Sequence, residues 1–194
     1  IQVGKTLQKL WGKSWIIGDF CGSDVYVDQE NGTYKVYVVS LSHLNLLNTD
    51  VLAKENVLED AQEVFRAAPE VLKHSMFSRA SDTYCLGHLI WETLTAFDNP
   101  KMKKDDFKEK LQFDGFKSLS QIKDEIRRNN ENEEKEKLEV PDYNQWVQKY
   151  YNEKVQEKLE ERLTKPKCCS EDFYLFIKEC LHVKDCNRPT KSLV

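Results

Sequence analysis

The chain of 194 residues lacks several features that would place it in a class at once. No apolar run reaches the roughly 18 residues of a membrane-spanning helix. A strong charge of one sign is missing too: the net charge is −4 and no basic run stands out, so we expect no nucleic-acid or membrane contact. There is no signal peptide and no initial Met, which indicates a piece cut from a longer protein.

Paired Cys-x-x-Cys motifs are also absent, although the chain has six cysteines. Their spacing is irregular, and Cys85 and Cys180 lie in apolar helical patterns. This favours reduced thiols in a cytoplasmic protein, or in the cytoplasmic part of a larger one, over a disulfide framework. Without paired spacing we expect no zinc site. The candidate zinc ligands, which lie close together in the sequence, are Cys168, Cys169, Cys180, His182 and Cys186.

Three segments have the apolar spacing of helices. Residues 1–12 carry apolar positions on one face, and residues 170–181 form a second amphipathic pattern. Residues 81–95 are apolar nearly all the way round, which predicts a helix buried in the middle of a helical domain. Pro100 ends that region. A chain of this length holds one domain with a substantial core, and we expect it to be mainly α.

One β-hairpin interrupts the helical pattern. Residues 25–27 and 34–39 are short runs rich in Val and Tyr, and Asn31-Gly32 lies between them. An Asn-Gly pair between two such runs is a strong hairpin signal. For residues 41–66 we expect a loop with a short helix.

Residues 101–165 are highly charged in part. From residue 121 to residue 140, twelve of twenty residues are charged, five basic and seven acidic. One interpretation is solvated helix surface and a flexible insert. The other is an arm that docks a protein partner, anchored by Trp146, Tyr150 and Tyr151.

Three short sequence motifs follow one another along the chain, and their order is informative. They are Ala68-Pro69-Glu70, the run Ser81-Asp82-Thr83-Tyr84-Cys85-Leu86-Gly87 that continues to Trp91-Glu92, and Asn187-Arg188-Pro189-Thr190. Together they resemble the end of the activation segment, the following helix and the close of the C-terminal lobe of eukaryotic protein kinases, in a tyrosine-kinase-like form. The resemblance covers most of residues 1–194, with 101–165 atypical of the family. It implies a kinase-like C-terminal lobe, with a small hairpin at the catalytic loop and no N-terminal β-lobe.

The resemblance implies structural roles for three residues. Glu70 is expected to pair with Arg188 and so fix the end of the activation segment onto the helical core. Asp82 is expected to accept N–H groups from the catalytic loop, which suits a carboxylate. These roles concern the fold and say little about activity.

The positions that would carry the chemistry are degenerate. The hairpin aligns Ile17-Gly18-Asp19 with the His-Arg-Asp motif, which leaves Asp19 as a vestigial base. Asp24 then falls on the metal-binding Asn, and an aspartate still offers oxygen ligands. Val38 falls on the magnesium-binding Asp and has no donor atom, so the mechanism loses its central ion. We therefore expect no intact catalytic residue and no metal or cofactor site.

A second alignment stays open. Gly18-Asp19-Phe20-Cys21 itself resembles Asp-Phe-Gly, which would make Asp19 a magnesium ligand and place the hairpin inside the activation segment. No catalytic loop then fits upstream, because residues 1–12 have a helix pattern. The chain has no Gly-rich loop and no Val-Ala-Ile-Lys-type strand, and we interpret Gly4-Lys5-Thr6 as a chance match to a phosphate loop.

Three functional hypotheses follow. The first is a pseudokinase fragment that acts as a scaffold or allosteric module for protein partners in signalling. The second is an active protein kinase with an atypical catalytic loop, in which Asp19 is the base and a preceding upper lobe supplies the ATP and magnesium site. The third is a helical interaction domain that shares the motifs by chance.

Overall fold

The structure is a computed structural model, and its helices begin and end close to the expected positions. The helices are α1 (Gln2–Trp11), α3 (Pro69–His74), α4 (Arg79–Asp98) and α8 (Glu171–Cys180), with 3₁₀ turns η1 (Gly22–Asp24) and η2 (Asp185–Asn187). The strands are β1 (Trp15–Ile16), β2 (Val25–Glu30), β3 (Thr33–Val38), β4 (Asn45–Leu46), β5 (Leu52–Ala53) and β6 (Met76–Phe77). The structure describes residues 2–18, 20–39, 45–46, 52–53, 67–74, 76–100, 163–182, 184–191 and 193.

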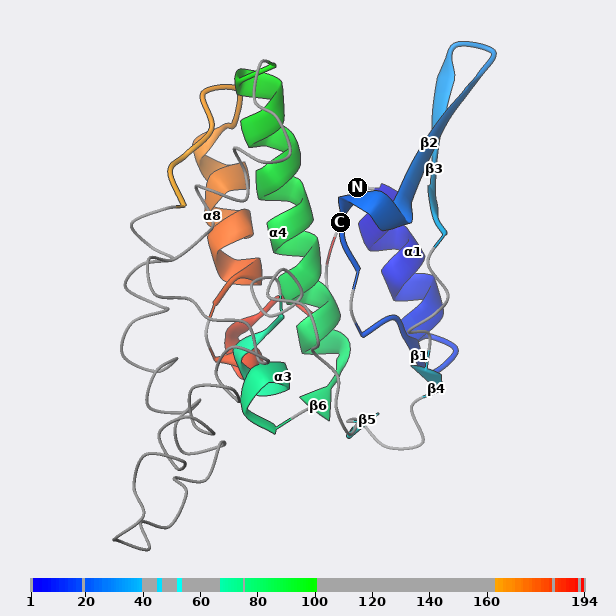
Figure 1. Cartoon of the computed structure of the whole chain (residues 1–194), viewed down its shortest axis with the longest axis vertical. Coiled ribbons are helices and arrows are strands. Elements are labelled where there is room, and N and C mark those ends of the chain that lie inside the picture. The colour runs from blue at the N-terminus through cyan, green and yellow to red at the C-terminus, as the bar shows by residue number, and fades with distance from the viewer. Residues whose placement is uncertain are drawn as a thin grey trace, which may run out of the picture.

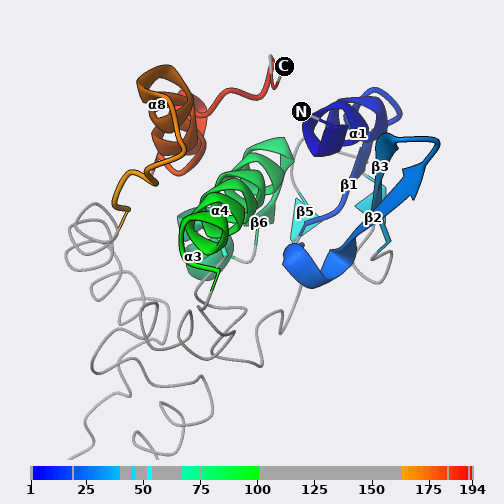
Figure 2. The same cartoon turned by 90° about the horizontal axis from the view of Figure 1, so that it is seen from above.

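Helix α4 lies at the centre of the described part of the chain, between α8 on one side and α1 with the β2–β3 hairpin on the other (Figures 1 and 2). Ser78 begins the helix: its side chain accepts hydrogen bonds from the N–H groups of Ala80 and Ser81. Residues 80–88 and Trp91 are buried. The prediction of a buried central helix is therefore confirmed for its first half, whereas most residues from 89 onward are partly exposed.

Helix α8 packs closely against α4 because one position in α4 has no side chain. A Cβ atom added at Gly87 would lie 2.8 Å from the Cβ of Cys180 and 2.9 Å from the Cγ of Leu181. Only glycine permits this separation of the two helices. Asp98, at the end of α4, accepts the N–H groups of Lys167 and Cys168 and so holds the turn that leads into α8.

Helix α1 packs through one face. Leu7 and Trp11 are buried there, four residues apart, as an amphipathic helix requires. Gly4 lies against the C-terminal end of the chain, where an added Cβ would come within 3.0 Å of the Leu193 carbonyl oxygen. The two ends of the chain therefore meet at α1 (Figure 1).

The hairpin has the predicted turn. Asn31 and Gly32 both have positive φ, 50° and 76°, as the two central residues of a tight hairpin turn require. The register pairs Val25 with Val38 and Tyr26 with Tyr37. On the outer edge of β3, the side-chain amide of Gln2 donates to the Tyr34 carbonyl and accepts the Val36 N–H, each over 2.9 Å.

The remaining strands are only two residues long and form two small antiparallel pairs, β1 with β4 and β5 with β6. β4 and β5 lie in the segment 41–66, and the short helix expected there falls outside the described residues. The atypical segment 101–162 and its anchors Trp146, Tyr150 and Tyr151 also fall outside them. None of the described helices has the length and apolarity needed to cross a membrane.

Candidate functional site

Asp82 binds the backbone that precedes the expected catalytic position. It is fully buried near the start of α4. One carboxylate oxygen, Oδ1, accepts the Gly18 N–H over 2.7 Å, and the other, Oδ2, accepts the Ile17 N–H over 3.2 Å. The Trp11 indole N–H also donates to Oδ2, over 2.8 Å. Three donors from two segments therefore satisfy a buried charge, which would otherwise be costly.

Gly18 has the backbone conformation that this arrangement needs. Its φ is +87°, a region that side chains other than hydrogen rarely adopt. A Cβ at this position would also lie 3.0 Å from the Phe77 ring. The residue where the family motif has Arg is thus fixed by both backbone geometry and packing. Asp19, the vestigial base, lies outside the described residues.

Asp24 is engaged within its own loop. Its Oδ2 accepts the Cys21 N–H over 2.8 Å and so closes the 3₁₀ turn η1. Its backbone carbonyl accepts the Val39 N–H over 2.7 Å, which extends the hairpin ladder by one bond. The structure therefore brings Asp24 next to Val38, the two residues that the alignment places at the family's metal-binding positions.

Val38 is half-buried and packs against the hydrophobic core. Its side chain is hydrocarbon, so of these two neighbouring positions only Asp24 offers an oxygen to a cation. The described residues contain no group of three or more His, Cys, Asp or Glu side chains placed to hold a metal ion.

Glu70 and Arg188 form a bidentate ion pair. The guanidinium donates to the two carboxylate oxygens over 2.6 and 2.9 Å. It also donates to the carbonyl oxygens of Ala80 and His182, over 2.9 and 2.7 Å. The Arg188 side chain is completely buried and that of Glu70 nearly so. One residue near the C-terminus thus joins α3, α4 and the loop after α8.

The Tyr84 ring completes this cluster. The Arg188 guanidinium lies over the ring, 4.8 Å from its centre, in a cation–π contact. Burial raises the pKa of the Tyr84 hydroxyl well above its usual value, and the nearby Arg188 charge offsets part of this rise. Tyr84 is therefore neutral at any physiological pH, so the charges at the cluster's centre are those of Glu70 and Arg188.

Sequence reasoning missed two residues of this framework. The helix pattern of residues 1–12 treats Trp11 only as an apolar residue, but its indole N–H donates to Asp82. A buried Trp needs a partner for that N–H, which is a usable signal, but the pattern does not say which partner. Asp98 gave no signal, because the turn that it holds lies 69 and 70 residues further along the chain.

The chain matches the family model of protein tyrosine and serine/threonine kinases over residues 1–194. Because the match covers the whole chain, the chain belongs to the protein kinase family. The family resemblance of the three sequence motifs is confirmed, and the hypothesis of a chance resemblance is wrong. No curated protein matches the chain.

Proposed function

We propose that this chain is the C-terminal lobe of a tyrosine-kinase-like pseudokinase domain, which acts as a scaffold or allosteric partner in cytoplasmic signalling. The single observation that carries the proposal is Val38. In the alignment, this residue stands where the mechanism needs a magnesium-binding carboxylate. Its hydrocarbon side chain packs against the core and cannot bind the ion that neutralises the phosphates.

The contrast between framework and chemistry supports this proposal. The groups that hold the lobe together, Glu70, Asp82 and Arg188, are all present and all hydrogen-bonded. A domain that keeps these structural contacts but lacks the metal-binding carboxylate is suited to binding partner proteins through its surface. Asp24 adds to the argument, because one of its oxygens already accepts the Cys21 N–H within its own turn.

The second candidate is an active kinase with Asp19 as the base. One observation favours it: Asp82 holds the two N–H groups directly before Asp19, so that the backbone leading into this position is firmly placed. A base fixed in position is one requirement of general base catalysis. The metal then has to be held by Asp24 and by groups outside the described residues.

The deciding experiment measures ATP binding by the full-length parent protein, with and without magnesium, by thermal shift. A pseudokinase shows no shift, or a shift that does not depend on magnesium. A magnesium-dependent shift, with phosphate transfer that Asp19→Asn abolishes, would establish the second candidate instead.

A variant that adds the missing carboxylate tests the same proposal through a gain of magnesium-dependent ATP binding. Val38→Asp restores a carboxylate at the position that lacks one, and Val36→Asp places the same group two residues away on the same strand. If Val38 is the missing ligand, only the Val38→Asp protein gains magnesium-dependent ATP binding. Circular dichroism shows whether both variants are folded before they are compared.

Protein partners are part of the proposal, and residues 101–165 are their proposed docking arm. Replacing 101–162 with a Gly/Ser linker, in the parent protein, should abolish partner capture in cross-linking experiments while α1, α4 and α8 keep their packing, because the buried Leu163 and the Thr164 carbonyl that accepts the Trp91 indole N–H are retained. Unchanged capture by the linker variant would assign the partner surface elsewhere.

A further inference from the structure

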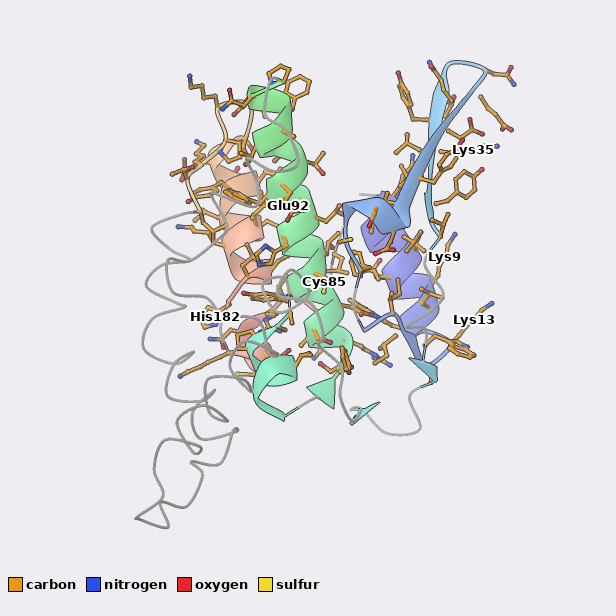
Figure 3. The ribbon with its side chains drawn as sticks, viewed as in Figure 1. Lys9, Lys13, Lys35, Cys85, Glu92 and His182 are labelled. Carbon is orange, nitrogen blue, oxygen red and sulfur yellow. The ribbon has the colours of Figure 1, made fainter. Side chains whose placement is uncertain are left out.

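Three lysines recur at intervals of four residues along α1 and just beyond its end. They are Lys5, Lys9 and Lys13, and all three are exposed. Residues four apart on a helix lie on the same side, about 6 Å apart along the axis, so Lys5 and Lys9 lie in one row on α1. Lys13 follows in the turn just after α1, where its N–H donates to the Leu10 carbonyl. Figure 3 shows Lys9 and Lys13 on the outer side of α1, pointing away from α4. We call these three residues the lysine row.

The lysine row forms no ion pair with another described residue. Residues 1–18 contain no Asp or Glu, although the whole chain has a net charge of −4. Where the chain is described, ion pairs involve Lys35, Lys165 and Arg188, and none of them involves the row. Like charges four residues apart on a helix repel each other. A ligand that brings negative charge to the row removes this repulsion.

We infer that the lysine row docks an extended, acidic peptide segment of a partner protein. Alternate side chains of an extended chain point to the same side and repeat every ~6.6–6.8 Å. This spacing is close to the ~6 Å repeat of the row. Carboxylates at every second position of such a peptide therefore face the three ammonium groups in turn.

The neighbouring hairpin determines how the peptide binds. Its β3 edge is not open for an added strand at Tyr34 and Val36, because the Gln2 amide already bonds there. The peptide is therefore held by its side chains, through charge. The hairpin also projects past the start of α1 and carries Asp28 and Glu30, so a flat anionic membrane fits this side of the molecule poorly (Figure 1).

The test uses the whole chain and a fluorescein-labelled peptide of alternating Glu and Ser, with binding followed by anisotropy. We expect binding that weakens steeply as salt is raised, because the row is exposed and its charges are screened. The triple variant Lys5→Gln, Lys9→Gln, Lys13→Gln should lower the affinity about tenfold, as the loss of three exposed ion pairs implies.

The matched control removes the same charge elsewhere. Lys167, Lys178 and Lys184 are exposed and lie on or beside α8, away from the row, and their triple change to Gln should leave the affinity within about twofold of the wild type. Equal losses in the two triple variants would overturn the assignment. So would tighter, row-dependent binding to vesicles of phosphatidylserine and phosphatidylcholine than to the peptide.

A second peptide tests the spacing. It has the same composition, but its Glu residues stand in one block, so that only half of them face the row. We expect it to bind more weakly than the alternating peptide, and equal binding would contradict the spacing argument. None of these measurements involves ATP or magnesium, so failure of the docking assignment is distinguishable from failure of the pseudokinase proposal.

Discussion

Trp11 and Asp82, 71 residues apart in the sequence, are joined by a buried hydrogen bond of 2.8 Å from the indole N–H to the carboxylate. This bond links α1 to α4. It shares Asp82 with the Ile17 and Gly18 N–H groups, so that helix packing and the backbone geometry at residues 17 and 18 depend on one side chain. The position of the loop is therefore coupled to the stability of the helical core.

Replacing Trp11 with Phe tests that coupling. The change keeps an aromatic ring but removes the indole donor, which leaves Asp82 with one fewer partner. We expect the free energy of unfolding to fall by about 1–3 kcal/mol, as for other buried groups that lose a partner. Urea denaturation measures the change. Trp15→Phe, in the half-buried strand β1, is the control, and an equal loss in both variants would show that the bond contributes little.

Replacing Glu70 with Gln tests the ion pair with Arg188. The variant keeps the shape of the side chain but leaves the buried guanidinium without a counter-charge. Breaking one side of a buried pair destabilises a protein by about 3–5 kcal/mol. Thermal unfolding should show a large loss of stability.

The control for Glu70 is Glu171, which pairs with Lys165 on the surface. Glu171→Gln should change the stability far less, because exposed ion pairs contribute little. If the two variants unfold alike, Arg188 is held mainly by the Ala80 and His182 carbonyls and by the Tyr84 ring.

Gly87→Ala tests the contact between α4 and α8. The added methyl group would lie 2.8 Å from the Cβ of Cys180, so the helices have to move apart. Overpacking of this kind costs about 1–3 kcal/mol, which outweighs the gain in helix propensity. Gly12→Ala is the control, because its nearest atom is 3.4 Å away and the site is exposed. A Gly87→Ala protein as stable as wild type would mean that the two helices separate easily.

Cys180 provides a chemical measure of the same contact. Burial raises the pKa of its thiol to about 12, so little thiolate forms at neutral pH and reagents cannot reach it. With iodoacetamide at mildly alkaline pH, we expect the exposed Cys168 and Cys186 to react first and Cys180 only after unfolding. Mass spectrometry of the labelled peptides gives the order. Early labelling of Cys180 would show that α8 opens in the native state.

The sequence predicts the helices and the hairpin well because their signals are local. The periodicity of α1, α4 and α8 and the Asn31-Gly32 turn each depend on residues within one element. The two-residue strands β4 and β5 have no such signal, since their pairing partners lie far along the chain. The ion pair of Glu70 and Arg188 was expected only through the family resemblance, because nothing local joins positions 118 residues apart.

The candidate site was only partly predictable. That Val38 occupies the position of a magnesium ligand follows from the family resemblance and the hairpin alignment, and it stays a prediction. The N–H groups that donate to Asp82 are brought together by the packing of α1 against α4. The sequence of one segment alone does not determine that packing. The net charge of the chain is negative and so does not indicate the lysine row. The row is recognised only when the helix period is applied to residues 1–18.

Tyr84 predicts how stability depends on alkaline pH. Burial raises the pKa of its hydroxyl in the folded protein, whereas the unfolded chain has the usual value of about 10. The folded state therefore holds this proton more tightly. The stability that the neutral hydroxyl provides is complete below pH ~10 and is lost progressively as the pH rises above that value.

The measurement compares the wild type with Tyr84→Phe, which cannot ionise at this position. Thermal midpoints from pH 8 to pH 11 should fall more steeply in the wild type, with the two curves diverging only above pH ~10. Ionisation of Tyr174 and of the lysines is common to both proteins and cancels in the difference. Parallel curves over the whole range would mean that the Tyr84 hydroxyl titrates equally in the folded and unfolded states, and hence that water reaches the cluster around Arg188.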